Sequence, residues 1–133
     1  MNRVFVDTSA VLACLVATDA EHPEARASLS ALAARDASLV TSSYVLAETY
    51  ALVQSRLGPA WVREVRATYE PLLAVTWIDR ELHEEGLDRL VAEDRRTLSL
   101  VDTTSFAVMR RLGLKRAFAF DPHFAEAGFS LLS

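Results

Sequence analysis

Cysteine is nearly absent from this sequence, since Cys14 is the only one in 133 residues. A single cysteine excludes an intrachain disulfide, and its position in an apolar run indicates a small core residue rather than a nucleophile. The chain also lacks an apolar run of about 18 residues, the length that a membrane-spanning helix needs. Asp7 interrupts the apolar N-terminal segment and no small-residue cleavage site follows, so we expect no signal peptide and a cytoplasmic protein.

Excess positive charge is missing as well. The formal net charge is -4 at pH 7, and the two halves on either side of residue 60 each contribute -2. Without a basic tail or lobe, the sequence argues against tight nucleic-acid binding driven by bulk charge, so any nucleic-acid chemistry must depend on a local site. The three histidines, His22, His83 and His123, are scattered, which argues against a zinc hydrolase.

The order of apolar and amphipathic segments predicts an α/β fold. No repeat, linker or low-complexity segment divides the chain, so we expect one domain over residues 1–133. The predicted strands are Arg3–Val6, Leu39–Thr41, Ala74–Ile78, Ala117–Phe120 and, more weakly, Gly128–Leu132. Helices between the strands imply right-handed crossovers and a three-layer α/β/α arrangement around a mainly parallel sheet of four to five strands.

Capping residues mark the predicted helix ends. Helices are expected at Ala10–Leu15, Pro23–Arg35, about Tyr44–Leu57, Pro59 to Pro71, after Asp79, and Ser99–Leu112. Thr8 or Ser9 is expected to cap the first helix, and Ser42 or Ser43 the third. The helix after Asp79 is expected to bury Leu82, Leu87, Leu90 and Val91 on its inner face.

Two aspartates are predicted at the ligand-binding edge of this sheet. Asp7 and Asp121 each follow a predicted buried strand, and open α/β sheets bind ligands at the carboxyl ends of their strands. The alternative is that each merely caps the next helix.

Two further acids on predicted helices are candidates for the same site. Glu48 lies among apolar residues, where an unpaired carboxylate would be costly; alternatively it lies at the rim of an exposed stripe, paired with Arg56. Asp102 lies in the first turn of its helix, where the helix dipole alone would favour an acid. The other acids of residues 81–94 are interspersed with arginines, which is typical of a solvated face.

Four segments that contain these acids resemble the PIN-domain ribonucleases, and most closely the VapC-like toxins of bacterial toxin-antitoxin pairs. They are residues 4–10 (VFVDTSA), 41–48 (TSSYVLAE), 98–106 (LSLVDTTSF) and 118–124 (FAFDPHF). The resemblance implies an acidic quartet of Asp7, Glu48, Asp102 and Asp121 that binds Mg²⁺ or Mn²⁺, with Ser9 supporting the first acid. It also implies an RNA substrate and a small VapB-like antitoxin partner.

The leading hypothesis is a metal-dependent endoribonuclease, in which Asp7 and Asp102 bind metal, Glu48 binds metal or orients water, and Asp121 completes an outer position. One alternative is a catalytically silent interaction module that only shares the fold. Another is a phosphatase or phospho-receiver domain. Sites of those kinds need a further acid next to the first one, and this sequence has Thr8 and Ser9 at the corresponding positions, which argues against both.

Basic and apolar residues suggest how RNA and a second copy could bind. The candidate phosphate-binding residues are Arg95, Arg96, Arg110, Arg111, Lys115 and Arg116, for which ion pairing and solubility are the alternative. A homodimer is expected because two predicted helical segments offer more apolar surface than one thin sheet can cover. These segments contain Trp61, Val62, Val65 and Tyr69, and Leu46, Tyr50 and Val53.

Overall fold

The structure is a computed structural model, and it describes residues 2–132. In chain order the elements are β1 (Arg3–Val6), α1 (Thr8–Leu15), α2 (His22–Ala34), β2 (Ser38–Ser42), α3 (Ser43–Leu57), α4 (Pro59–Glu64), a π-helical turn η1 (Val65–Tyr69), a 3₁₀ turn η2 (Glu70–Leu72), β3 (Leu73–Thr76), α5 (Arg80–Glu93), α6 (Leu100–Leu112), β4 (Arg116–Phe118), α7 (His123–Glu126) and β5 (Ser130–Leu131).

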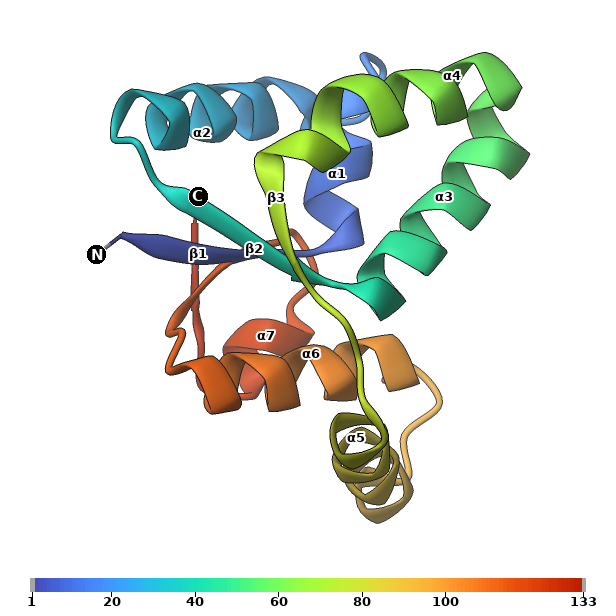
Figure 1. Cartoon of the computed structure of the whole chain (residues 1–133), viewed down its shortest axis with the longest axis vertical. Coiled ribbons are helices and arrows are strands. Elements are labelled where there is room, and N and C mark those ends of the chain that lie inside the picture. Colours follow the sequence, from blue (N-terminus) through green and yellow to red (C-terminus); the bar gives the residue numbers. More distant parts are fainter. Residues whose placement is uncertain (1, 133) are drawn as a thin grey trace.

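The five strands form one sheet in the order β3-β2-β1-β4-β5, and all four pairings are parallel. The predicted α/β class and its three layers are therefore confirmed. Figure 1 shows α1, α2 and α4 on one side of the sheet and α6 and α7 on the other, with α5 beyond α6. Because β1 is central, its carboxyl end lies between those of β2 and β4.

Alternating side chains of β1 supply both faces of the sheet. Phe5 belongs to a core cluster with Phe106, Phe124 and other residues of α6 and α7. Val4 and Val6 belong to a second cluster with residues of α1 and α2, including the buried Cys14. β1 is buried on both faces, which explains why it reads as a continuous apolar run.

The apolar surface from which we predicted a dimer is largely internal, so that argument was wrong. Val53 and Val65 are buried with Leu15 in a third cluster, against which Val62, Tyr69 and others pack. Gly58, at φ 95°, separates α3 from α4, and α4 and η1 pack back against α3 and α1. Of the seven residues named, Trp61 alone is a large exposed hydrophobic, with 39% of its surface accessible.

Capping explains where the long helices begin and end. Ser42 caps α3 by accepting from the Val45 amide, and Asp79 caps α5 by accepting from the Leu82 amide. Gly113 ends α6 in the left-handed conformation at φ 70°. The cap of α1 is Asp7 rather than the expected Thr8 or Ser9, since its side chain accepts from the Ser9 amide.

Two sequence predictions about single elements were wrong. β4 ends at Phe118, so Ala119 and Phe120 separate the strand from Asp121. Val91 is 71% exposed and does not join the inner face of α5. The end of β4 was misjudged because the same apolar pattern fits both a strand and the residues that follow it. Val91 was misjudged because it lies in the last turn of α5, where helix periodicity is least reliable.

No helix among residues 2–132 is both long enough and apolar enough to cross a membrane.

The position of α6 depends on close packing against α5. Gly86 of α5 is buried against Thr104 of α6, and a Cβ at position 86 would lie 2.8 Å from Thr104 Cγ2 and 3.1 Å from its Cα. This leaves no room for a side chain, so the two helices are held at a distance that only glycine allows.

We expect Gly86→Ala to destabilise the protein by about 0.5–2 kcal/mol, because an overpacking cost of about 1–3 kcal/mol outweighs the gain of about 0.5–1 kcal/mol that alanine gives in a helix. Chemical denaturation measures the change. Glu85→Ala, at the exposed neighbouring position, is the control and should change the unfolding free energy by less than about 0.5 kcal/mol. A Gly86→Ala variant more stable than the wild type would show that α5 and α6 are not packed this closely.

Candidate functional site

All four predicted acids line one cavity of about 330 Å³ at the carboxyl edge of the sheet. Asp7 follows β1, Glu48 comes from α3, Asp102 from the first turn of α6, and Asp121 from the segment after β4. The remaining lining residues are Thr8, Ser9, Leu12, Leu52, Thr97 and Ser99. Residues 114 positions apart in the sequence thus meet because parallel strands end at the same edge.

Asp7 is held by Ser9 through one carboxylate oxygen. Its Oδ2 accepts from the Ser9 amide at 3.2 Å and from the Ser9 hydroxyl at 2.7 Å. The Asp7 amide donates to the Phe118 carbonyl at 3.0 Å, which continues the pairing of β1 with β4. Asp7 therefore caps α1 and has a fixed position at the sheet edge.

Asp102 is held in a capping box at the start of α6. Its Oδ2 accepts from the Ser99 amide at 3.1 Å, and its own amide donates to the Ser99 hydroxyl at 3.0 Å. The side chain is buried, with 7% of the residue exposed. An acid in a first turn is favoured electrostatically as well.

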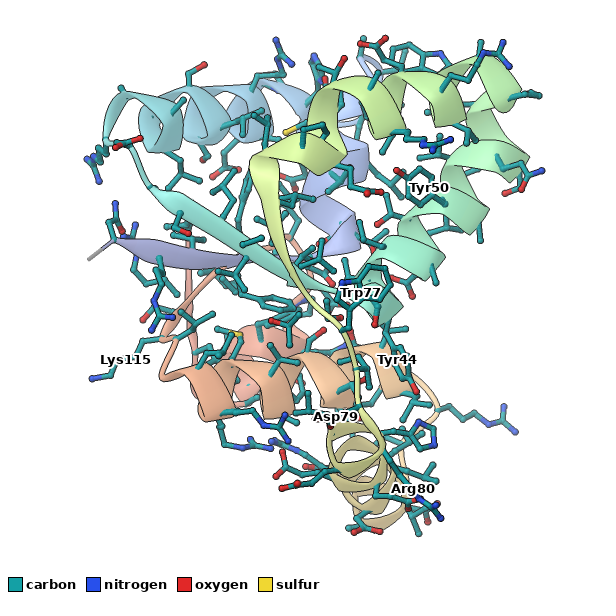
Figure 2. All side chains as sticks on the ribbon, viewed as in Figure 1. Tyr44, Tyr50, Trp77, Asp79, Arg80 and Lys115 are labelled. Atoms are coloured by element: carbon teal, nitrogen blue, oxygen red, sulfur yellow. The ribbon has the colours of Figure 1, made fainter. Side chains whose placement is uncertain are left out.

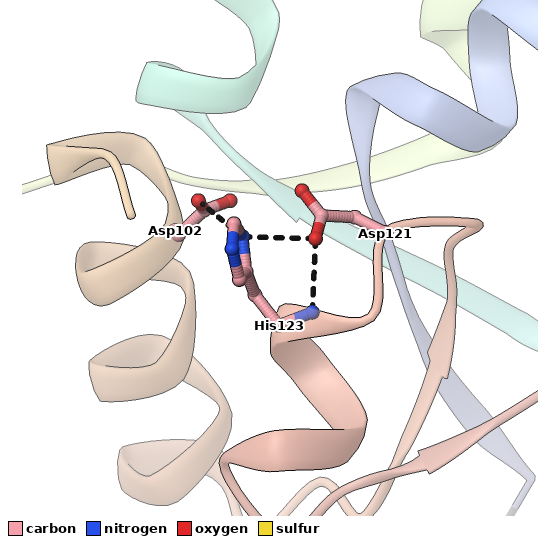
Figure 3. Close-up of side chains that lie close together, drawn as sticks. All are labelled: Asp102, Asp121 and His123. Carbon is pink, nitrogen blue, oxygen red and sulfur yellow. Dashed lines mark hydrogen bonds and ion pairs between the residues drawn. The ribbon is translucent and has the colours of Figure 1, made fainter. Parts of the chain in front are cut away.

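Asp121 is joined to Asp102 by a histidine (Figure 3). The Oδ1 atom of Asp121 accepts from the His123 amide at 2.9 Å and lies 2.9 Å from His123 Nδ1. The same Nδ1 atom lies 3.2 Å from Asp102 Oδ2. Potential ligand atoms of these three residues all lie within 4.8 Å of one another.

The three aspartates share one pattern of hydrogen bonding. Within residues 2–132, every hydrogen bond that they accept goes to a single oxygen: Oδ2 of Asp7, Oδ2 of Asp102 and Oδ1 of Asp121. No buried side-chain polar atom in this part of the chain lacks a hydrogen-bond partner, so the second oxygens of these three cavity-lining residues are accessible to solvent. Each aspartate thus offers one oriented, unpaired oxygen for a ligand.

Glu48 completes the acidic lining from α3 and is half-buried. Its helix is tied to α1 beside it, because the Thr8 hydroxyl contacts the Val45 carbonyl at 3.3 Å and the Thr49 hydroxyl at 3.0 Å. The alternative pairing with Arg56 is wrong: among the ion pairs of the described residues, none joins Glu48 to an arginine.

The convergence of acids changes the ionisation of Asp7. The pKa of this carboxyl is raised from its ordinary value of 3.8 to about 6, chiefly by burial; the two hydrogen bonds from Ser9 oppose the rise, and the nearby charges of Asp102 and Glu48 add to it. Desolvation disfavours the charged form of an acid. A positive charge in the cavity would reverse this penalty.

His123 is the residue of this site that sequence reasoning missed. We treated the histidines as scattered, and His22 and His83 do lie elsewhere, bonded to the Ala13 carbonyl and to Tyr44. His123 has only 12% of its side chain exposed and contacts two of the predicted acids. The available signal was its position two residues after Asp121, within a segment already singled out.

Of the six basic residues predicted to bind RNA, two are paired with acids and three lie away from the acidic cavity, and their role stays a prediction. Arg95 pairs with Glu126 and Arg111 with Asp79, both at 3.0 Å. About ten residues of α6 separate Asp102 from Leu112, which is about 15 Å along the helix, so Arg110, Lys115 and Arg116 lie toward the other edge. Figure 2 likewise shows Lys115 on the opposite side of the molecule from Tyr44 and Trp77.

Comparison with known proteins gives a consistent result. A family model described as the PIN domain matches residues 4–130. The chain is 39% identical over 127 residues to the 23S rRNA-specific endonuclease VapC20 of two Mycobacterium tuberculosis strains, which covers 95% of each chain.

Comparison with solved structures leads to the same family. The crystal structure of Mycobacterium tuberculosis VapC20, described as a sarcin-ricin loop cleaving toxin, superposes with a TM-score of 0.82 at 38% identity, covering 95% of both chains. FitAcB from Neisseria gonorrhoeae shares the fold with a TM-score of 0.70 at 17% identity, covering 98% of this chain and 96% of that one. With its acids placed at one sheet edge, the chain belongs to the PIN-domain family, and within that family to the VapC-type toxin endonucleases.

Proposed function

We propose that this protein is a divalent-metal-dependent endoribonuclease whose site is formed by Asp7, Glu48, Asp102 and Asp121. The observation that supports it most directly is the open oxygen on each of the three aspartates. Mg²⁺ and Mn²⁺ prefer oxygen ligands and retain several waters. A set of oxygens held on separate elements, and left without protein donors, fits such an ion.

The residues present have distinct roles in this proposal. Asp7 and Asp102 would hold the metal through the oxygens that face the cavity, and Asp121 would supply a further ligand or an outer contact. Glu48, which accepts no hydrogen bond from the described residues, would bind metal or orient the attacking water. When bound, the ion supplies a more acidic water and stabilises charge on the phosphoryl oxygens.

His123 has a positioning role in this proposal. Its Nδ1 can donate to Asp102 Oδ2 and lies 2.9 Å from Asp121 Oδ1, so one ring helps to fix the separation of two ligand side chains. Side chains that orient metal ligands in this way contribute about 10- to 100-fold in metal affinity.

The relatives indicate where to look for the substrate and partner. We propose 23S rRNA as the first substrate to test, a small VapB-like antitoxin as the partner, and one domain for the whole of this function. A homodimer remains a prediction. Its best support is exposed apolar surface at the ends of the edge strand β3, where Leu72 is 56% and Trp77 is 73% exposed.

We expect Asp7→Asn and Asp102→Asn each to lower cleavage of RNA at least about 100-fold, which corresponds to about 2.7 kcal/mol of lost transition-state stabilisation. Asparagine keeps the size of the side chain and can still cap a helix. Turnover is measured with Mg²⁺ or Mn²⁺ and with chelator. Asp88→Asn, at an exposed position of α5, is the control and should match the wild type. Near-normal turnover by both site variants would overturn the assignment.

The role of His123 is tested by metal binding itself. We expect His123→Ala to weaken Mn²⁺ binding by about 10- to 100-fold, measured by calorimetry without RNA. His123→Asn should restore part of the affinity, because its amide nitrogen can occupy the position of Nδ1. His83→Ala is the control for loss of a histidine elsewhere. Equal affinities for the wild type and His123→Ala would refute the positioning role.

Asp7 also links stability to pH. Because its folded pKa of about 6 lies above the ordinary value of 3.8, the folded protein holds an extra proton. The resulting stabilisation is fully present below about pH 4 and is lost as pH rises through about 6, a change of about 3 kcal/mol. In chelator at pH 7.5, we expect Asp7→Asn to melt higher than the wild type.

Added metal should change the order of the melting temperatures of Asp7→Asn and the wild type. It stabilises the wild type by about 2.7 kcal/mol at a hundred times its dissociation constant, and Asp7→Asn by less. Melting curves at pH 5 and pH 7.5, with chelator and with Mn²⁺, measure both effects. If Asp7→Asn melts lower than the wild type in chelator at pH 7.5, then Asp7 acts chiefly as a cap for α1.

A further inference from the structure

A second, larger cavity adjoins the acidic one. It has a volume of about 550 Å³ and shares Ser9, Leu12 and Asp121 with the acidic cavity. Pockets that bind a small ligand have volumes of roughly 300–1,000 Å³, so this one can take a group the size of a nucleotide. A strand with its scissile phosphate at the acids could therefore extend directly into it.

Ser9 holds one wall of this cavity at a fixed position relative to the acids. Its hydroxyl donates to Asp7 Oδ2 at 2.7 Å and accepts from the Phe120 amide at 3.0 Å. The opposite wall is the loop between α1 and α2, which is held where His22 Nδ1 meets the Ala13 carbonyl at 2.8 Å. Both walls are thus built into the fold.

The lining combines the two kinds of group that a nucleotide needs. Phe120 is a half-buried aromatic of the lining, and Leu12, Ala13, Val16 and Leu57 add further apolar surface. Arg56, exposed in the last turn of α3, is the one cation of the lining among the described residues. Aromatic rings stack on bases of any sequence, and a guanidinium pairs with phosphate through two hydrogen bonds.

Arg56 is also available for a ligand. None of the ion pairs formed within residues 2–132 involves it, whereas Arg95 and Arg111 are engaged by acids. Besides the shared Asp121, the lining holds two more acids, Asp19 and Glu21, and one Asp19 oxygen accepts from the Glu21 amide at 2.8 Å. They can accept from the amino and imino groups of a base, which leaves Arg56 as the phosphate contact.

We propose that this cavity is a subsite for one unpaired nucleotide next to the scissile bond of the RNA, with its base against Phe120 and its phosphate at Arg56. The proposal rests on the proposed ribonuclease function and adds to it how the strand is positioned. An overall acidic protein would then hold RNA by a local stacking and pairing site rather than by a basic surface.

The test pairs protein variants with altered RNA. The probe is an RNA oligonucleotide that the wild type cleaves at a mapped bond, beginning with fragments of 23S rRNA, together with versions that lack the base at one position on either side of that bond. We expect Phe120→Leu and Arg56→Ala to raise KM by about 5- to 150-fold, with a smaller change in kcat. Arg63→Ala, an exposed arginine of α4 outside this lining, is the matched control.

Removal of the correct base should reproduce the defect of Phe120→Leu in the wild type and cause little further loss in that variant. Such non-additivity places the base and the ring in contact. Additive effects at every position, or an unchanged KM for Arg56→Ala, would overturn the subsite even though the wild type cleaves the probe. Loss of antitoxin binding by Arg56→Ala with normal cleavage would likewise overturn it. If the wild type cleaves nothing with metal, the failure lies in the proposed function instead.

Discussion

The attachment of each aspartate through one oxygen is the constraint on which the site depends. Carboxylates that converge without a counterion repel one another and lose hydration, and Asp7, with a pKa raised to about 6, shows the cost. The chain limits their movement by giving one oxygen of each to a backbone amide nearby in sequence. Because those amides belong to the starts of α1, α6 and α7, the fold itself restricts the orientation of each carboxylate.

This arrangement removes the choice between a structural and a functional role that the sequence presented. Asp7 and Asp102 were each open to interpretation as a helix cap or as a ligand, and the structure shows that each forms its cap through one oxygen only, which leaves the other oxygen for the proposed ligand role. A cap uses one lone pair of one oxygen, so it competes little with a metal at the other. A first-turn acid in an α/β fold is therefore not evidence against a site when its helix begins at the carboxyl edge of the sheet.

The sequence predicted the elements and the edge well, because both follow from short-range rules. Buried parallel strands read as apolar runs, and caps such as Asp79 and Ser99 were visible directly. Features that depend on three-dimensional packing were not predictable. His123 reaches Asp102 only because α6 and the turn after β4 lie side by side, and the apolar residues around Val53 and Val65 proved to be internal because the chain reverses at Gly58 and packs α4 and η1 against α3 and α1. Likewise, Arg95 and Arg111 found partners 31 and 32 positions away.

Charge placement, rather than net charge, decides how such a protein can act on RNA. Bulk electrostatics at a net charge of -4 repel a polyanion, and the acidic quartet adds to this repulsion until cations neutralise it. Metal bound at the open oxygens would neutralise part of that charge where the phosphate must approach. Stacking on Phe120 would add binding that needs no net positive surface, and Ser9 connects the two sites through a single hydroxyl. The shared hydroxyl fixes the stacking wall to the first acid, so a base bound there constrains the adjoining phosphate relative to the metal ligands. Such positioning contributes to catalysis by reducing the entropy lost on reaching the reactive geometry.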